Sequence, residues 1–251
     1  QALAGFGAKT EEKILKELET FGQRKERLPA WQLEPVVHEI NELLASIPEV
    51  ERFSVAGSFR RVNETSKDVD FIVATEQHDI VREALLANLE IVETVAAGDT
   101  KVSVILDKED QVSVDFRLVK NHEFSTALHH FTGSKDHNVR MRQLAKDQGK
   151  KISEYGVVQE NGTIETFDSE EAFFAHFGLP FIPPTVRENG KELERLAELK
   201  ELVTLEDIVS DLHMHTTWSD GAHSVAEMGE ALIAKGYNYA VITDHSQYLK
   251  V

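Results

Sequence analysis

Residues 57–73 read GSFRRVNETSKDVDFIV, a glycine-serine-arginine loop followed by two aspartates on a strand-like run. The period of two of a β-strand places Asp68 and Asp70 on one face and sends the alternating apolar residues into the core. Two carboxylates on one face can bind one cation together. The stretch therefore predicts a strand that presents an acidic pair beside an anion-binding loop.

A second run, QVSVDFRL at residues 111–118, alternates more strictly. Its valines, phenylalanine and leucine fall on one face, and Asp115 falls on the other between Ser113 and Arg117. This pattern predicts a strand with a third carboxylate on its polar face.

Three carboxylates with room for water and phosphate oxygens suit Mg²⁺ or Mn²⁺. Two such ions can clamp the attacking and leaving oxygens of a phosphoryl displacement. Ser58 and Arg61, with the backbone N–H groups from Gly57 onward, would bind a triphosphate, because an anion needs fixed donors. The pattern indicates nucleotidyl transfer. Taken alone, Asp-x-Asp is more often a solvated strand end and Gly-Ser a simple turn, but their joint occurrence favours a metal site.

These motifs resemble the palm of family X DNA polymerases, the group that includes DNA polymerase beta. The run Phe131-Thr132-Gly133-Ser134 with Asn138 and Arg142 resembles the part of that family that closes over the incoming nucleotide. Similarity extends from residue 3 to about 185, and the departures from polymerase beta resemble the bacterial branch. One departure is His130, which replaces a tyrosine and leaves sugar selectivity open.

The resemblance implies roles for individual residues. Asp68 and Asp70 would bind both metal ions, and Asp115 would join them at the ion that activates the primer 3'-hydroxyl. The incoming nucleotide would contact Gly57, Ser58, Arg61, Phe131, Gly133 and Asn138. Arg142 would contact the template strand.

The segment from residue 3 to residue 10 places Gly5, Gly7 and Lys9 before a predicted helix. Glycines allow close backbone approach, and a helix N-terminus offers N–H groups to an anion. The segment resembles the hairpin of a helix-hairpin-helix motif, which in this family binds DNA without reading its sequence. An ordinary glycine turn before a helix is the alternative.

Near the C-terminus, His213 and His215 stand two residues apart on a predicted strand, followed by Asp220 and His245. Imidazoles with a carboxylate suit Zn²⁺, Mn²⁺ or Fe²⁺. The pattern of strand 212–216, helix 225–234 and strand 239–243 predicts the first βαβ unit of a β/α barrel.

This part resembles the opening of the polymerase and histidinol phosphatase domain, with these four residues as metal ligands. The barrel is unfinished at residue 251, so we expect no phosphoesterase or exonuclease activity from this chain as given. The front of the chain also looks trimmed.

The formal net charge is -17, which is unusual for a DNA-binding protein. Its distribution is uneven. Residues 120–151 carry seven basic and three acidic residues, a balance of +4, and residues 152–211 carry four basic and fourteen acidic residues, a balance of -10. The predicted nucleotide and template face is thus basic, although such a cluster can also be a solvated helix face.

The chain has no cysteine and no apolar run of the ~18 residues that span a bilayer. We expect a cytoplasmic monomer without membrane contact.

The fold class predicted is α+β. A helical segment precedes a nucleotidyltransferase palm, a small α+β thumb, a charged helical linker and the start of a β/α barrel. The predicted domains are 1–50, 51–120, 121–185, 186–210 and 211–251.

The function predicted is DNA-directed DNA synthesis on primed or gapped DNA from deoxynucleoside triphosphates. One alternative within the palm superfamily is an antibiotic or tRNA nucleotidyltransferase, against which the glycine hairpin and the run 131–142 argue. A metal-dependent phosphoesterase or 3'-5' exonuclease with the palm as a docking module is a second. A noncatalytic DNA-binding fragment is the third.

Overall fold

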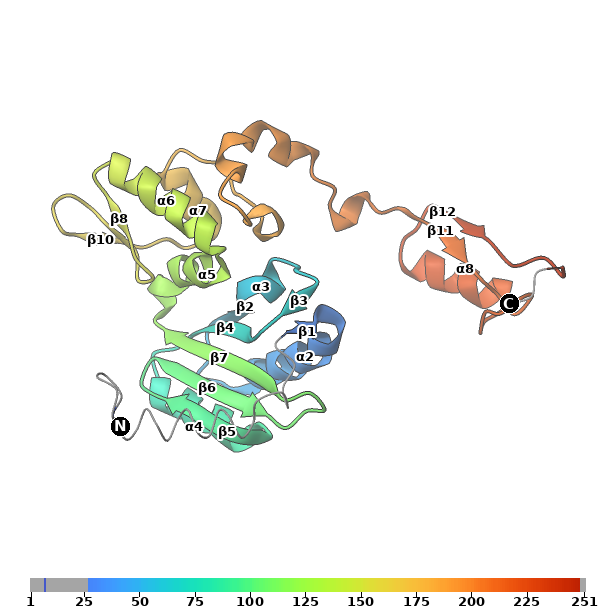
Figure 1. Ribbon diagram of the computed structural model, residues 1–251, viewed down its shortest axis with the longest axis horizontal. Helices are drawn as coiled ribbons and strands as arrows, with labels where there is room; N and C mark the ends of the chain where they lie inside the picture. The colour runs from blue at the N-terminus through green and yellow to red at the C-terminus, as the bar shows by residue number, and fades with distance from the viewer. Residues whose placement is uncertain (1–6, 8–26, 249–251) are drawn as a thin grey trace. The chain divides into compact units, whose positions relative to one another are not determined.

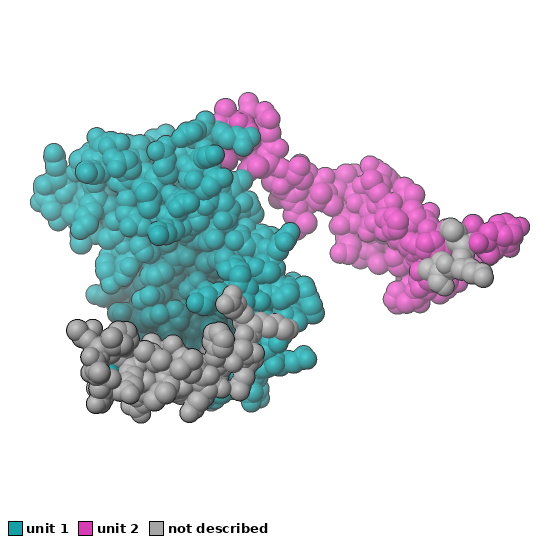
Figure 2. Space-filling model, in the orientation of Figure 1, with its two compact units in different colours: residues 1–196 teal, residues 197–251 magenta. Residues whose placement is uncertain are grey.

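The computed structural model describes Gly7 and residues 27–248, and the chain divides into two compact units, residues 1–196 and 197–251 (Figure 2). The predicted DNA-binding hairpin at Gly5 and Lys9 lies outside the described residues. Gly7 is described as exposed, with nothing near its Cα that a side chain would meet.

The palm is a five-stranded sheet covered on one face by α2 (Ala30–Ser46) and α4 (His78–Asn88) (Figure 1). One pair of neighbouring strands is parallel, and the other three pairs are antiparallel. In spatial order the strands are β2 (Arg52–Val55), β4 (Val69–Ala74), β7 (Val112–Val119), β6 (Lys101–Leu106) and β5 (Ile91–Ala97).

The core between sheet and helices follows the predicted hydrophobic patterns. The α2 stripe Leu33, Val36, Val37, Ile40 and Leu44 is buried, as its helical spacing predicts. Phe71 of β4 stacks on Phe116 of β7 with ring centroids 5.6 Å apart. The opposite, polar face of β4 and β7 carries the acidic residues, and this face is partly covered by α5 (Phe124–Thr132).

The loop from β2 to β4 contains a short helical turn, α3 (Gly57–Arg60), and a short strand, β3 (Thr65–Ser66). The strand β3 pairs antiparallel with β1 (Leu28–Pro29). These pairings hold the predicted anion-binding loop against the edge of the palm.

The thumb follows the palm and is α+β, as predicted. Ser134 caps α6 (Lys135–Asp147), because its Oγ accepts a hydrogen bond from the N–H of His137 at 3.3 Å. Its remaining elements are η1 (Asn121–Glu123), β8 (Lys151–Ile152), β9 (Val157–Val158), β10 (Ile164–Glu165), α7 (Glu170–His176) and η2 (Pro184–Val186). An Asn161-Gly162 turn, a dipeptide typical of hairpins, joins β9 to β10 in an antiparallel pair.

The segment predicted as a charged helix is instead a series of 3₁₀ turns, including η3 (Glu192–Glu194) and η4 (Leu196–Glu201). Gly190, with φ +74°, interrupts the helical path. Glu192 is buried, so the beginning of this segment packs on the thumb rather than lying free in solvent.

The second unit contains η5 (Leu205–Asp207), β11 (Ser210–Met214), α8 (Val225–Ala234) and β12 (Tyr239–Ile242). The two strands are parallel, so the predicted βαβ unit is confirmed. The helix has the predicted bounds, and Ser224 and Glu227 form a capping box at its start. Among the described residues, every helix is too short or too polar to traverse a bilayer.

Candidate active site and candidate metal centre

The palm brings the three predicted carboxylates together. Asp70 and Asp115 face each other directly in the register of the parallel strands β4 and β7, and Asp68 immediately precedes β4. Burial raises the pKa of Asp70 from 3.8 to about 7, with further contributions from the charges of Asp68 and Asp115. Nearby Arg117 and Lys101 lower this pKa but do not outweigh burial and the two carboxylates, and a hard divalent cation fits this donor set.

Lys101 is the residue of this site that sequence reasoning missed. Its Nζ lies 2.6 Å from Oδ2 of Asp115. Lys101 lies opposite Arg117 in the register of β6 and β7, so both basic side chains lie on the same face of the sheet as the carboxylates. The sequence signal for Lys101 was the alternation of Lys101 and Ser103 with buried valines on β6, because it puts both residues on the polar face of the sheet. Ser103 lies opposite Asp115 in the register of β6 and β7.

Gly57 lies directly against the acidic cluster. It has φ +62°, and a Cβ built there would come within 2.3 Å of Oδ2 of Asp70. Only glycine fits this close approach. The predicted nucleotide-binding loop is thus in contact with strand β4, which carries Asp70. In the same loop, Oγ of Ser58 donates a hydrogen bond to Oγ of Ser66 at 2.8 Å.

Arg61 bridges the palm and the thumb. Its Nη1 donates to the carbonyl of Thr132 at 2.6 Å, and its Nε lies 2.7 Å from Oε1 of Glu188. A Cβ built at Gly133, which has φ +69°, would lie 3.3 Å from Nη1 of Arg61. Arg61 and Gly133, which are predicted from separate motifs to contact the nucleotide, therefore lie next to each other.

The predicted thumb residues form a second connected group. The side-chain amide of Asn138 donates to the carbonyl of His130 at 2.7 Å, and Nε of Arg142 donates to the carbonyl of Asn138 at 3.1 Å. The ring of Phe131 lies under the guanidinium of Arg117, 4.7 Å from its centroid, which connects this group to the palm.

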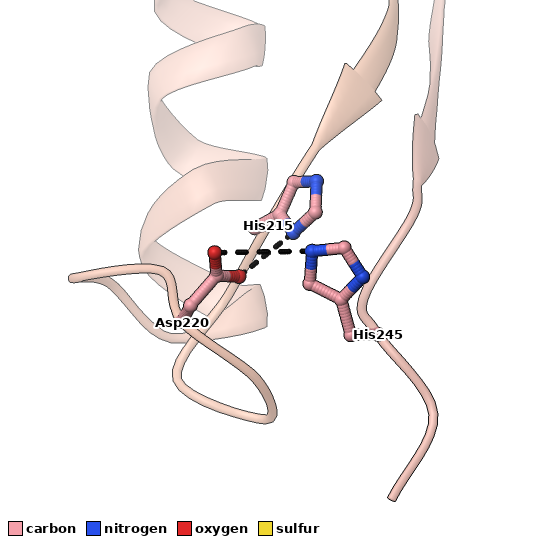
Figure 3. A group of neighbouring side chains, drawn as sticks. All are labelled: His215, Asp220 and His245. Atoms are coloured by element: carbon pink, nitrogen blue, oxygen red, sulfur yellow. Dashed lines mark hydrogen bonds and ion pairs between the residues drawn. The ribbon is translucent and has the colours of Figure 1, made fainter. Parts of the chain in front are cut away.

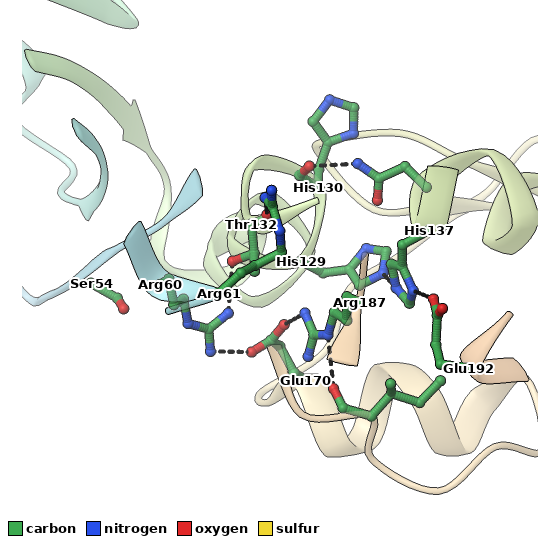
Figure 4. Close-up of polar contacts among 12 residues, drawn as sticks. Ser54, Arg60, Arg61, His129, His130, Thr132, His137, Glu170, Arg187 and Glu192 are labelled. Carbon is green, nitrogen blue, oxygen red and sulfur yellow. Dashed lines mark hydrogen bonds and ion pairs between the residues drawn. The ribbon is translucent and has the colours of Figure 1, made fainter. Parts of the chain in front are cut away.

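A buried ion-pair network beneath these residues was not predicted. Oε1 of Glu170 accepts from Nη1 of Arg187 at 2.7 Å, and Oε2 accepts from Nη2 of Arg60 at 2.5 Å (Figure 4). Arg187 is fully buried and also lies over the rings of Phe174 and Phe181. The two arginines hold the pKa of Glu170 below its ordinary value although burial alone would raise it.

A chain of two histidines and a glutamate lies in the thumb core, also unpredicted. The Nε2 atoms of His129 and His137 are 3.0 Å apart, and Nδ1 of His137 is 2.6 Å from Oε1 of Glu192 (Figure 4). Burial lowers the pKa of both histidines, and His129 is the more strongly affected. A neutral pair sharing one proton satisfies this geometry.

The second unit brings together three of its four predicted ligands. Nδ1 of His215 is 2.8 Å from Oδ1 of Asp220, and Nε2 of His245 is 3.8 Å from Oδ2 (Figure 3). One donor atom from each of these residues lies within 4.8 Å of the others. His213 is adjacent, with its Nε2 3.1 Å from Nε2 of His215. This donor set fits Zn²⁺, Mn²⁺ or Fe²⁺.

Asp244 holds the loop that carries Asp220, a role that was not predicted from the sequence. Its carboxylate accepts hydrogen bonds from the N–H and Oγ1 of Thr216, both at 2.6 Å, and from Oγ of Ser219 at 2.7 Å. These bonds fix the loop that carries Asp220.

Sheet order, carboxylate register and a following α+β subdomain are consistent with the predicted polymerase beta-like palm and thumb. Comparison with known proteins agrees. Residues 127–188 match the family model of the DNA polymerase beta thumb. The chain is also similar to the protein named DNA polymerase/3'-5' exonuclease PolX of Bacillus subtilis (strain 168), with 56% identity over 252 residues. The match covers 100% of this chain and 44% of that protein, so the chain spans less than half the length of this relative. The predicted similarity to family X DNA polymerases is confirmed.

Proposed function

We propose that this protein is a DNA-directed DNA polymerase that adds deoxynucleotides to a primer 3'-hydroxyl and fills short gaps during DNA repair. The observation that carries the proposal is the register of Asp70 opposite Asp115, with Asp68 next to them and Gly57 against Asp70. The similarity to a protein named as a DNA polymerase supports it.

The residues divide the work of the reaction. Asp68, Asp70 and Asp115 would hold Mg²⁺ or Mn²⁺, which when bound supplies the positive charge that stabilises the transferring phosphoryl group. Ser58, Arg61 and the backbone of the Gly57 turn would bind the triphosphate.

Further from the carboxylates, Phe131, Gly133 and Asn138 would enclose the nucleotide, and Arg142 would contact the template. The residues predicted to bind DNA from the N-terminal hairpin are Gly5, Gly7 and Lys9. We propose that the protein acts as a monomer.

A gap-filling assay tests this function, with labelled primer on gapped DNA, four deoxynucleotides and Mg²⁺. Asp115→Asn is expected to abolish extension while gapped-DNA binding stays near wild type, because phosphate contacts elsewhere provide the affinity. Asp99→Asn is the matched control, since the Asp99 side chain is 96% exposed on the β5–β6 turn. Extension by Asp115→Asn at the wild-type rate would overturn the assignment.

A second candidate function is metal-dependent phosphoester hydrolysis at the cluster of His215, Asp220 and His245. The convergence of these donors favours it, and the relative's printed name includes a 3'-5' exonuclease. The test is Mn²⁺-dependent trimming of DNA. His213→Ala with His215→Ala should remove trimming and spare gap filling. Trimming that persists in this double variant would assign the activity elsewhere.

A further inference from the structure

Arg61 is held by an acidic residue of the thumb. Nε of Arg61 lies 2.7 Å from Oε1 of Glu188, while Nη1 donates to the carbonyl of Thr132. The Arg61 side chain is only 12% exposed, whereas that of Glu188 is 45% exposed. Within the described residues, Nη2 of Arg61 makes no hydrogen bond, so this end of the guanidinium keeps its donors available.

Glu188 is itself fixed in place. Its carbonyl accepts a hydrogen bond from Oγ of Ser134 at 2.6 Å, and the preceding carbonyl, of Arg187, accepts from the N–H of Ser134 at 2.9 Å. The Arg187 side chain pairs with Glu170, which pairs in turn with Arg60. The neighbours Arg60 and Arg61 of the palm are thus connected to the neighbours Arg187 and Glu188 of the thumb. Arg61 contacts Glu188 directly, and Arg60 is connected to Arg187 through Glu170.

This arrangement removes most of the freedom of a long side chain. An arginine loses rotamer entropy when it binds an anion, and a guanidinium already held in place loses less. Glu188 accepts a hydrogen bond from Nε of Arg61, and the carbonyl of Thr132 accepts one from Nη1. These two contacts fix the orientation of the guanidinium and therefore the direction in which Nη2 points.

We infer that Glu188 is a positioning residue for the nucleotide triphosphate and acts through the guanidinium of Arg61. The inference rests on the proposed polymerase function. The required property of Glu188 is an acceptor for the Nε–H of Arg61, which a glutamine amide oxygen can also supply.

The test is steady-state gap filling by Glu188→Ala and Glu188→Gln, with inorganic tripolyphosphate as a competitive probe. Glu188→Ala should raise the KM for the deoxynucleotide by about three- to tenfold with kcat within about twofold, because ground-state and transition-state contacts of Arg61 weaken together. The inhibition constant of tripolyphosphate should rise by the same factor. Glu188→Gln should stay within about twofold of wild type in both constants.

Glu194→Ala is the matched control. Glu194 lies in the same segment as Glu188 and forms an exposed ion pair with Arg140 at 3.1 Å. Its replacement should change neither the KM for the deoxynucleotide nor kcat. In the background of Arg61→Ala, Glu188→Ala should have no further effect on KM, since the residue through which it acts is gone.

Three outcomes would overturn the inference: an unchanged KM in Glu188→Ala, an equal rise in Glu188→Ala and Glu188→Gln, or a fall in KM in both, which would make Glu188 a competitor of the triphosphate. Failure of the proposed function is distinguishable, because the wild-type protein would then extend no primer. The Glu188 side chain is 45% exposed, so Glu188→Ala is expected to fold, and thermal unfolding of both variants checks that the KM values come from folded protein.

Discussion

Asp70 and Asp115 lie opposite each other in the register of two parallel strands, and this pairing places two like charges side by side on one sheet face. Such a pair, with Asp68 beside it, costs folding free energy unless a cation is bound. Burial first, and then the charges of Asp68 and Asp115, raise the pKa of Asp70, so ionising this carboxylate costs folding free energy.

The first prediction concerns stability as a function of pH without divalent ions. The folded-state pKa of Asp70, about 7, lies above the ordinary value of 3.8. Its contribution to stability is therefore full below pH 3.8 and is lost as the pH rises to about 7. Asp70→Asn has no such loss, so in EDTA the variant should become more stable than wild type at pH 8 by about 1–2 kcal/mol.

Urea unfolding at pH 5 and pH 8 measures this difference. Asp99→Asn, which removes an exposed carboxylate, should retain the wild-type difference between the two pH values. An Asp70→Asn protein that is less stable than wild type at pH 8 in EDTA would show that the carboxylate is neutralised by its surroundings, with Lys101 as the candidate.

A second prediction concerns the buried pairs of Glu170. Glu170→Gln leaves the guanidinium of Arg187 inside the thumb without its charged partner and weakens the contact with Arg60. Breaking one partner of a buried ion pair costs about 3–5 kcal/mol. We expect a loss of that size in the free energy of unfolding, and Glu171→Gln on the exposed side of α7 should lose less than about 0.5 kcal/mol. Equal stability of the two variants would contradict a structural role for the network.

The three carboxylates of the candidate active site could be predicted from the sequence because their signal is local. The alternation in β4 and β7 fixes which side chains are polar, and the structure confirms that Asp70 and Asp115 share the face predicted for each strand. The helix α8 was equally predictable, since Ser224 and Glu227 mark its start within four residues.

The contacts that build the thumb were not accessible, because their partners are far apart in sequence. Arg60 and Glu170 are 110 residues apart, and a charge run alone does not say which pair will be buried. The segment after Glu188 shows the same limit. Its composition suggests a solvated helix, but Glu192 is buried and its carboxylate contacts His137, which lies 55 residues earlier in the sequence.

A third prediction concerns acid sensitivity of the thumb. Burial lowers the pKa of His129 well below 6.5, so the unfolded chain binds a proton at that position before the folded protein does. This contribution to stability is therefore full above pH 6.5 and is lost as the pH falls below it. His129→Leu keeps an apolar group against Phe173 and removes the titration, although Nε2 of His137 loses its partner.

We expect the free energy of unfolding of His129→Leu to be about 1–3 kcal/mol lower than that of wild type at pH 7.5. Between pH 7.5 and pH 5 the variant should lose less stability than wild type loses. Thermal unfolding at the two pH values measures both effects. His122→Gln, at an exposed position, should retain the wild-type difference between the two pH values. A pH dependence in His129→Leu as steep as in wild type would assign the acid sensitivity to other groups.

The last prediction concerns the metal centre of the second unit and the aspartate behind it. The carboxylate of Asp244 holds Thr216 and Ser219, and these residues position the loop that places Asp220 against His215. Groups that orient metal ligands contribute to affinity although they do not touch the ion. Asp244→Ala should weaken Zn²⁺ binding by about 10- to 100-fold in a chelator competition titration. His215→Ala, which removes a ligand, should weaken it at least as much, and Glu230→Gln on α8, which removes one acidic charge outside the cluster, should leave it unchanged. Wild-type Zn²⁺ affinity in Asp244→Ala would mean that the ligands are held without this aspartate, whereas equal losses in Asp244→Ala and Glu230→Gln would reduce the effect to net charge.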